Sequence, residues 1–254
     1  MKLAISGKGG TGKTTLSTLL ARYWAQQGKE VIAVDADPDA NLAEAIGIPA
    51  GADITPISEM RQFILDRTDA QGGYGGYFKL NPKVDDIPEK FSQTLDGIKL
   101  LVLGGADTGG GGCICPESAL LKALVTHLLL KPDQVVILDM EAGVEHLSRA
   151  TAQAVSAMIV VTEPGQRSVQ TALAVRRLAD QIGIKHVGAV INKVRPDLDL
   201  DPLKAMLGEV PLLGTLPFDP AVARADLEGR TCWLDTPEQR TYIEKIANAI
   251  PSDT

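Results

Sequence analysis

The chain has 254 residues, of which 44% are hydrophobic, and its 32 acidic and 25 basic residues leave a net charge of −7. This composition is typical of a globular protein with a sizeable core and not of a disordered chain. The acidic balance and the lack of a dense Lys/Arg run argue against a nucleic-acid surface, and no apolar run approaches the ~18 residues of a membrane span. Because Gly and Lys interrupt the apolar run of MKLAISGKGG, we expect no signal peptide and a cytoplasmic protein that binds neither nucleic acid nor membranes.

The chain alternates between strand and helix signals from its start. Lys2–Ser6 predicts a short strand, Thr14–Gln27 has apolar residues at helical spacing and ends at Gly28, and Glu30–Val34 predicts the next strand. Further strands are expected at Lys99–Leu103, Gln134–Leu138, Ala157–Thr162, His186–Asn192 and Leu212–Leu216. Strands that alternate with helices predict a doubly wound α/β fold, with a mainly parallel sheet and helices on both faces.

This alternation weakens at about 48–97. A helix is expected at Ile57–Thr68, but GGYGG at 72–76 is typical of a flexible turn. We interpret the segment as an irregular insertion on a single domain that spans 1–254 and is closed by a helix at Pro237–Ile250.

Residues 7–15, GKGGTGKTT, follow the first strand and open the first helix. The pattern Gly-x4-Gly-Lys-Thr is a phosphate-binding loop of a nucleoside triphosphatase. Its glycines let backbone N–H groups face the phosphates, the Lys13 ammonium neutralises the β and γ oxygens, and the Thr14 hydroxyl is a ligand for Mg²⁺. The expected nucleotide-binding residues of the loop are Gly9, Gly10, Thr11, Gly12, Lys13, Thr14 and Thr15.

A second lysine, Lys8, makes this loop unusual. KGGTGKT at 8–14 resembles the deviant KGGxGKT class of dimerising ATPases, which includes the nitrogenase iron protein, septum-site and plasmid-partition ATPases, and metal-cluster assembly ATPases. In that class the extra lysine reaches across a dimer interface and stabilises charge that develops in phosphoryl transfer on the partner's nucleotide. The resemblance implies a homodimer in which Lys8 and Lys13 are catalytic.

Three aspartates follow apolar strands. VDADPDANL places Asp35 and Asp37 at the carboxyl end of the second strand, where ligands bind in such sheets. Asp35 is expected in the Mg²⁺ shell, and Asp37 matches the family position that orients or deprotonates the attacking water; a solvated turn is the other interpretation of Asp37. VVILDMEAG has the Walker-B arrangement, in which Asp139 faces Mg²⁺-bound water and the Gly143 N–H senses the γ-phosphate.

Residues after the later strands are expected to contact the adenine. Asn192 in INKV matches the family's asparagine that hydrogen-bonds the base. LPFDP resembles the family's base-side loop, in which Pro217 and Phe218 would pack on the ring. Core packing is an equally weighted interpretation of Phe218.

Cys113 and Cys115 lie in the glycine-rich stretch GGGGCICPES. Residues two apart in extended backbone project to the same side, so both sulfurs can contact one metal ion. A disulfide across so small a ring would be strained, and the glycine run argues against a buried, inert pair. Two such pairs that face each other across a dimer axis would supply the four thiolates that suit Zn²⁺ or Ni²⁺.

The order of the motifs over nearly the whole chain resembles that of the CooC-type nickel-inserting ATPases. The motifs are KGGTGKTT, VDADPDANL, LNPKV, GGGGCICPE, ILDMEAGVEHLSR, TEPGQRS and VINKV. That family matures the nickel clusters of carbon monoxide dehydrogenase, and a close relative serves acetyl-CoA synthase. The resemblance implies an ATPase that uses Mg²⁺ with ATP and ADP, dimerises with ATP, and binds Ni²⁺ or Zn²⁺ at Cys113 and Cys115 of both subunits. It also implies delivery of nickel to one of these two apo-enzymes.

Two other functions stay open. An iron–sulfur ATPase of the nitrogenase-reductase kind needs a second cluster cysteine after the second switch, and residues 139–160 contain none. A partition or division-site ATPase needs a basic DNA face or an amphipathic membrane helix at the C-terminus, and TYIEKIANAIPSDT is short and weakly charged. The roles of Glu117, Glu145, His146 and Cys232 are unassigned.

Overall fold

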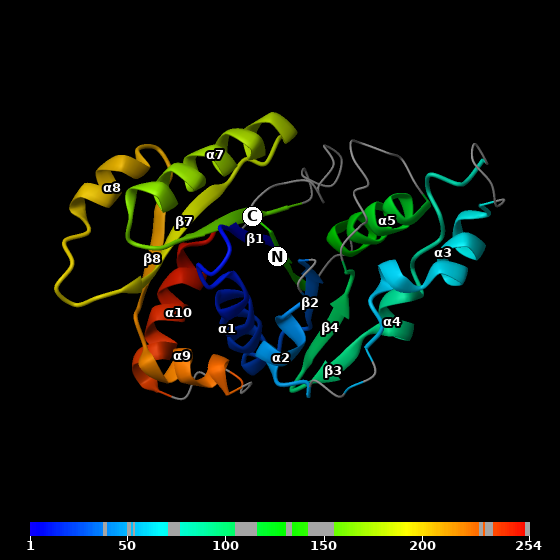
Figure 1. Ribbon diagram of the computed structural model, residues 1–254, viewed down its shortest axis with the longest axis horizontal. Coiled ribbons are helices and arrows are strands. Elements are labelled where there is room, and N and C mark those ends of the chain that lie inside the picture. The colour runs from blue at the N-terminus through cyan, green and yellow to red at the C-terminus, as the bar shows by residue number, and fades with distance from the viewer. Residues whose placement is uncertain are drawn as a thin grey trace.

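The computed structural model describes residues 1–37, 40–49, 52, 54–70, 77–104, 116–130, 134–141, 155–228, 231 and 236–251. Their strands form one eight-stranded sheet in the order β3-β4-β2-β5-β1-β6-β7-β8 (Figure 1). The strands are β1 (Lys2–Gly7), β2 (Val31–Ala36), β3 (Gln93–Leu95), β4 (Ile98–Val102), β5 (Val135–Met140), β6 (Ala157–Thr162), β7 (Val187–Val194) and β8 (Leu212–Pro217). Neighbouring strands are parallel except for β3 and β4, which pair antiparallel. The predicted α/β class with a mainly parallel sheet is therefore confirmed.

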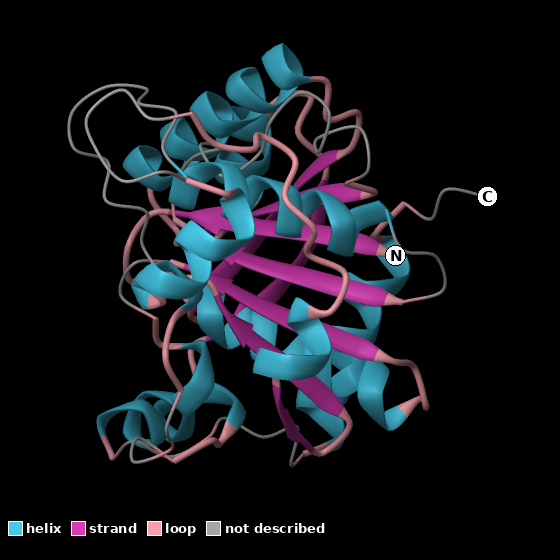
Figure 2. Ribbon diagram, turned by 90° about the vertical axis from the view of Figure 1, so that its right-hand side faces the viewer, coloured by secondary structure: helices cyan, strands magenta, loops and turns pink. Residues whose placement is uncertain are grey.

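Helices cover both faces of this sheet (Figure 2). They are α1 (Lys13–Gln26), α2 (Leu42–Ile46), α3 (Arg61–Thr68), α4 (Ile87–Phe91), α5 (Pro116–Leu130), α7 (Gln166–Ile182), α8 (Asp201–Leu207), α9 (Pro220–Leu227) and α10 (Pro237–Ala249), with a 3₁₀ turn η1 at Ile57–Glu59. α1, α2 and α10 pack on one face, whereas α3, α5, α7 and α8 pack on the other. Because side chains alternate along a strand, Leu3 and Ile5 of β1 pack with α1 on one face, whereas Ala4 packs in the core on the opposite face.

The elements of the sheet match the sequence patterns closely. Each expected strand is present with its ends shifted by no more than two residues. The largest extension that matters for the site is in β7, which continues past Asn192 to Val194. Parallel strands bring the segments that follow β1, β2, β5, β7 and β8 to the same edge of the sheet, and this edge holds the site.

The insertion has more regular structure than the sequence indicates. The helix expected at Ile57–Thr68 is divided into η1 and α3, because Met60 between them has ψ 61° and leaves the helical conformation. Farther on, α4 and the edge strand β3 were not predicted. The Phe63 ring meets the Phe91 ring edge-on at a centroid distance of 5.0 Å, so contacts between distant segments organise this region.

Candidate functional site

The phosphate loop connects β1 to α1 through backbone conformations that only glycine accepts easily. Gly12 has φ 93°, and a Cβ atom there would lie 2.1 Å from the Asn192 Nδ2 atom. Gly7 has φ 151°, and a Cβ atom there would lie 2.4 Å from the Val161 carbonyl oxygen. Gly7 and Gly12 are therefore required by close approach as well as by the turn.

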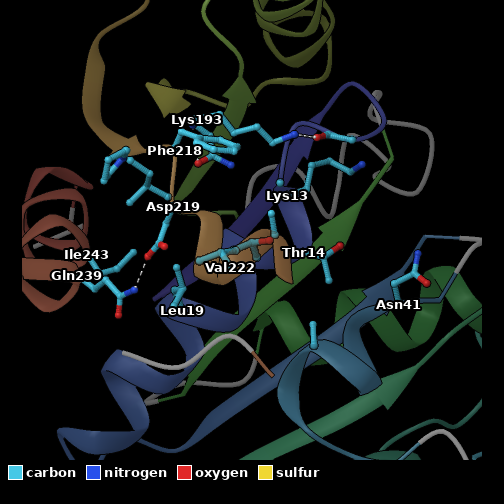
Figure 3. A pocket seen from close by; sticks show the side chains of 18 of the residues that line it. Lys13, Thr14, Leu19, Asn41, Lys193, Phe218, Asp219, Val222, Gln239 and Ile243 are labelled. Atoms are coloured by element: carbon cyan, nitrogen blue, oxygen red, sulfur yellow. Dashed lines mark hydrogen bonds between the residues drawn. The ribbon is translucent and has the colours of Figure 1, made fainter. Parts of the chain in front are cut away.

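A cavity of about 730 Å³ opens beside this loop (Figure 3). Its phosphate side is lined by loop residues that include Gly9, Gly10, Gly12, Lys13, Thr14 and Thr15. Its far side is lined by Pro217 and Phe218 after β8 and by Gln239 and Ile243 of α10. The size is within the range of ligand pockets, and the position at the carboxyl edge of a parallel sheet is where such folds bind nucleotides.

The two lysines of the loop occupy different places. Lys13 is nearly buried, lines the cavity, and its Nζ atom lies 3.7 Å from the Asp37 Oδ2 atom. Lys8 is exposed and is not among the residues that line the cavity. Its carbonyl oxygen accepts hydrogen bonds from the Thr11 hydroxyl at 2.8 Å and the Thr11 N–H at 3.2 Å. The loop therefore closes on itself at Lys8 while the Lys8 side chain stays outside its own cavity.

Asp35 holds the turn that carries Asp37. Its two carboxylate oxygens accept backbone hydrogen bonds from Asp37 N at 3.2 Å and Leu42 N at 2.9 Å. Burial raises the pKa of Asp35 to about 7, with a smaller contribution from the Asp139 charge, although the hydrogen bond from Leu42 lowers it. The carboxylate is thus a positioning group as well as an acid at the edge of the site.

Asp139 at the end of β5 is 1% exposed. Within the described part of the chain neither of its oxygens has a hydrogen bond of regular geometry, although the Thr14 and Ser17 hydroxyls lie close enough to lower its pKa. Burial raises the pKa of Asp139 to about 6, while the nearby Thr14 hydroxyl and Lys13 ammonium oppose this effect. A buried carboxylate that lacks a regular hydrogen bond is stable only with a positively charged partner. The carboxylate oxygens of Asp139 and the nearby Thr14 hydroxyl are oxygen ligands of the kind that a hard divalent cation such as Mg²⁺ prefers.

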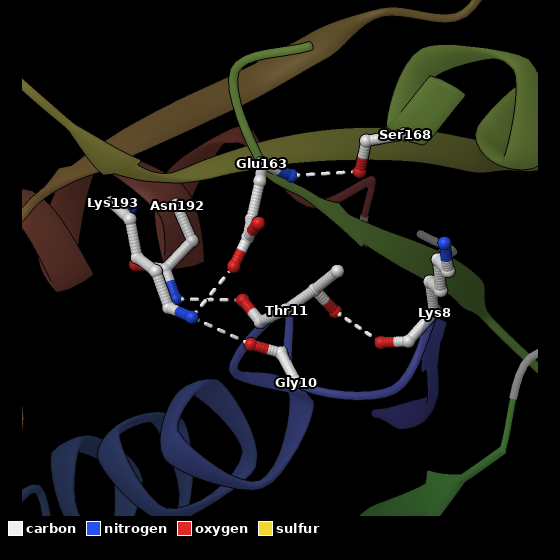
Figure 4. A network of polar contacts seen from close by, with 7 residues as sticks. All are labelled: Lys8, Gly10, Thr11, Glu163, Ser168, Asn192 and Lys193. Atoms are coloured by element: carbon white, nitrogen blue, oxygen red, sulfur yellow. Dashed lines mark hydrogen bonds and ion pairs between the residues drawn. The ribbon is translucent and has the colours of Figure 1, made fainter. Parts of the chain in front are cut away.

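Asn192 lies against the phosphate loop (Figure 4). Its Nδ2 atom donates a hydrogen bond to the Thr11 carbonyl at 2.8 Å, and its Oδ1 atom accepts one from Lys193 N at 2.8 Å. An amide group carries two N–H donors, so the one not directed to Thr11 is the group with which Asn192 would reach a base. The residue expected at the adenine is therefore also an anchor of the loop.

Pro217 and Phe218, which are expected at the adenine from the sequence, lie at the carboxyl end of β8, where it pairs with β7, beside the phosphate loop. Pro217 and Phe218 both line the cavity, and Phe218 is 46% exposed. This exposure rules out the core-packing interpretation of Phe218. Its backbone N–H donates to the Val194 carbonyl at 2.9 Å, which fixes the start of the base-side loop on β7.

Sequence reasoning missed the contributions of Lys193 and of α10. Lys193 contacts the loop and lines the cavity, and Gln239 of α10 donates through Nε2 to Asp219 Oδ2 at 2.9 Å. The capping box of α10, in which Thr236 and Gln239 exchange hydrogen bonds, was a readable signal for the helix start. No local signal indicated that this helix forms a wall of the cavity.

Several predicted residues lie outside the described part of the chain. They are the cysteine pair Cys113 and Cys115, the γ-phosphate sensor Gly143, and the unassigned Glu145, His146 and Cys232. Within the described ranges, no cluster of three or more His, Cys, Asp or Glu residues is arranged to hold a metal ion.

Comparisons with known proteins are consistent with this geometry. Residues 2–232 match the family model of the CobQ/CobB/MinD/ParA nucleotide binding domain. The chain is 45% identical over 252 residues to the carbon monoxide dehydrogenase accessory protein CooC of Rhodospirillum rubrum, covering 98% of this chain and 96% of that protein. It is 44% identical over 254 residues to an uncharacterised ATP-binding protein of Methanocaldococcus jannaschii, covering 98% and 97% of the two chains.

Solved structures show the same fold at low identity. The cell division protein MinD of Aquifex aeolicus superposes with a TM-score of 0.68 at 18% identity, covering 100% of this chain and 98% of that one. A plasmid partition protein of Borrelia burgdorferi bound to AMPPNP superposes with a TM-score of 0.70 at 15% identity, covering 98% and 97%. In the described part of the chain, none of the helices has the length and apolar character needed to cross a membrane.

Proposed function

The chain belongs to the CobQ/CobB/MinD/ParA nucleotide-binding family and, within it, to the CooC-type ATPases, and from this premise we propose that it is an ATP-driven nickel metallochaperone. The observation that carries the proposal is its 45% identity, over 98% of its length, to an accessory protein of carbon monoxide dehydrogenase. The proposed recipient is the apo-enzyme of carbon monoxide dehydrogenase or acetyl-CoA synthase. The cargo is Ni²⁺, or Zn²⁺ in its place, bound by Cys113 and Cys115.

ATP hydrolysis follows from the residues at the carboxyl edge of the sheet. The loop N–H groups and Lys13 bind the phosphates, while Asn192, Pro217 and Phe218 hold the base. Asp37 orients a water and takes its proton as the oxygen attacks the γ-phosphorus, so that the bond to the β-phosphate oxygen breaks and ADP leaves. When bound by Thr14 and by Asp35 and Asp139 through its water shell, Mg²⁺ supplies neutralisation of phosphate charge.

The position of Lys8 supports a homodimer as the active form. Because the exposed Lys8 side chain does not line its own cavity, it is available to the phosphates of a partner subunit. A cation there stabilises the charge of the transferring phosphoryl group, as an arginine finger does in other nucleotide hydrolases. The same twofold pairing would bring two Cys-x-Cys pairs together as one four-thiolate site.

Nucleotide state and metal release would then be linked through one interface. The segment 139–146 starts at Asp139, an expected Mg²⁺ partner, and contains Gly143, the residue expected to sense the γ-phosphate. Loss of the γ-phosphate would loosen this segment and the dimer with it. Separation of the two cysteine pairs would leave each half with two thiolates, too few for a tetrahedral site, and the ion would pass to the recipient.

Metal binding tests this proposal directly. The double variant Cys113→Ala/Cys115→Ala should lose stoichiometric Ni²⁺ binding in equilibrium dialysis with metal analysis, while it binds ATP as the unmodified protein does. The matched control is Cys232→Ala, which removes the third cysteine of the chain and should keep Ni²⁺ binding. Unchanged nickel binding in the double variant would refute the assignment of the metal site.

Solution mass tests the dimer. We expect the mass to double when saturating ATP and Ni²⁺ are added. A protein that stays monomeric under both ligands would contradict the shared site. A metal-free dimer whose ATPase activity responds to DNA or lipid would instead support a partition or division-site ATPase.

A further inference from the structure

Lys193 has an unusual backbone conformation at the end of β7. Its φ of 58° is in the left-handed region, which side chains other than glycine adopt at a conformational cost. The pairing of β7 with β8 shifts register between Ile191 and Val194, which marks a bulge at this point. Such a combination next to a ligand site indicates that the strand is distorted to direct a side chain.

The distortion directs two successive side chains to one target. Neighbouring residues of a regular strand point to opposite faces of the sheet. Here Asn192 donates to the Thr11 carbonyl at 2.8 Å, and the Lys193 Nζ atom donates to the Gly10 carbonyl at 2.6 Å (Figure 4). Two adjacent residues of β7 therefore hold two adjacent carbonyl groups of the phosphate loop.

These contacts determine where the loop N–H groups point. The peptide unit is planar and trans, so its C=O and N–H groups point in opposite directions. Fixing the Gly10 and Thr11 carbonyls toward β7 turns the N–H groups of Thr11 and Gly12 away from it. Because the Thr11 N–H is used by the Lys8 carbonyl, the Gly12 N–H is the one of these two that is left to bind a phosphate.

Packing does not confine this part of the loop. A Cβ atom added at Gly9 or Gly10 would meet nothing within 4 Å. Glycine explores more backbone conformations than any other residue, and Gly10 sits at φ 78°. The Gly10–Thr11 peptide is therefore held by hydrogen bonds at both of its polar groups, through the Thr11 N–H on the Lys8 carbonyl and through the Lys193 ammonium on the Gly10 carbonyl.

Glu163, in the segment after β6, holds the anchor in place. Its Oε1 atom lies 2.6 Å from the Lys193 Nζ atom, and its backbone N–H donates to the Ser168 hydroxyl at 2.9 Å. The Lys193 and Glu163 side chains are 43% and 44% exposed, so this ion pair is partly solvated. The carboxylate keeps the ammonium beside the Gly10 carbonyl and offsets its charge.

We propose that Lys193 is a positioning residue for the ATPase reaction. Its ammonium holds the Gly10 carbonyl, which pre-organises the phosphate loop, and Glu163 keeps the ammonium in that position. This inference rests on the ATP site of the proposed function and is independent of nickel and of the cysteine pair.

Substitutions at Lys193 separate the role of the side chain from that of the bulge. Lys193→Met should raise the dissociation constant and the KM for MgATP about tenfold, the effect of losing a charge-assisted hydrogen bond, with a smaller change in kcat. Lys193→Gly accepts the left-handed backbone without strain but lacks the ammonium, so its affinity for MgATP should fall as much as that of Lys193→Met. Lys193→Arg, which keeps a cation that can bridge a carbonyl and a carboxylate, should recover part of the affinity.

Two further variants complete the test. Glu163→Gln should raise the KM less than Lys193→Met does, because the ammonium can still reach the Gly10 carbonyl. The matched control is Lys204→Met, which removes a lysine paired with Asp201 on the exposed surface of α8 and should leave the KM unchanged. An unchanged KM in Lys193→Gly, or a fall in the urea unfolding midpoint of Lys193→Met without a change in KM, would overturn the proposal. Nickel binding by the same variants should be normal at saturating ATP, so failure of the metal assignment would be visible separately.

Discussion

The Lys13 Nζ atom lies 3.7 Å from the Asp37 Oδ2 atom, so the lysine of the phosphate loop and the carboxylate after β2 form an ion pair. Both side chains are largely buried, at 8% and 15% exposure, which limits the screening of their attraction by solvent. A bound triphosphate would compete with Asp37 for the ammonium. The entry of ATP would therefore release the carboxylate of Asp37 from Lys13 at the time when a water has to be oriented.

Asp37→Asn should separate binding from hydrolysis. The amide cannot accept the proton of the attacking water, so kcat should fall by a factor of about 100 or more. Affinity for ATP should stay the same or increase, because Lys13 loses a competitor for the phosphates. Single-turnover hydrolysis and equilibrium binding check the two parts, and a normal kcat would remove Asp37 from the catalytic role.

Gly12→Ala should abolish tight nucleotide binding. The added Cβ atom would lie 2.1 Å from the Asn192 Nδ2 atom, and the backbone at φ 93° is strained for alanine. The loop would have to move, and we expect ATP affinity to fall by more than about tenfold. The matched control is Gly165→Ala, which has extended backbone at φ −179° and no atom within 4 Å of the new Cβ. Equal ATP affinities of the two variants in a titration would contradict this account of the loop.

Asp139→Asn should change how stability depends on pH. The pKa of Asp139 is about 6 in the folded protein against 3.8 ordinarily, so the folded state binds more protons than the unfolded state between these values. The free energy of unfolding of the metal-free protein therefore falls as the pH rises from about 4 to about 6. Asparagine does not ionise, so the free energy of unfolding of Asp139→Asn does not fall in this way. At pH 8 the variant should therefore be more stable than the parent by up to about 3 kcal/mol.

Urea unfolding in EDTA at pH 5 and pH 8 checks this prediction. The quantity to compare is the difference between the variant and the parent at the two pH values. The control is Glu209→Gln, which alters an exposed carboxylate. It should change the free energy of unfolding by the same amount at pH 5 and at pH 8. A constant difference for Asp139→Asn would contradict a buried carboxylate of raised pKa. Binding of MgATP by Asp139→Asn should be weaker, because a hard cation prefers the carboxylate.

Phe218→Ala should reduce affinity for ATP without reducing stability. The ring is 46% exposed on the cavity wall, so its removal leaves no core cavity, whereas a bound base would lose an aromatic surface. We expect the KM for ATP to rise about tenfold and the unfolding free energy to change by less than about 0.5 kcal/mol. Leu198→Ala alters a residue of similar exposure, 41%, that does not line the cavity, and should leave the KM unchanged. A marked loss of stability in Phe218→Ala would contradict the placement of its ring on the cavity wall.

The sequence by itself determined the features that depend on neighbouring residues. The phosphate loop could be read because its glycines, Lys13 and Thr14 are spaced by the geometry of one turn. Strand runs that end in Asp35 and Asp139 could be read because a buried parallel strand is an apolar run, and the fold class followed from the alternation of such runs with helices. These patterns involve residues close together in the sequence, so they can be recognised without knowledge of how the rest of the chain folds.

Only the tertiary structure decided which distant residues complete the site. Lys193 meets Gly10 across 183 positions of sequence, and α10 forms a cavity wall because it packs beside α1. The left-handed conformation of Lys193 has no signature in an Asn-Lys dipeptide, since neither residue requires it. It arises where β7 and β8 change register, and register is set by the packing of whole strands, which no local spacing records.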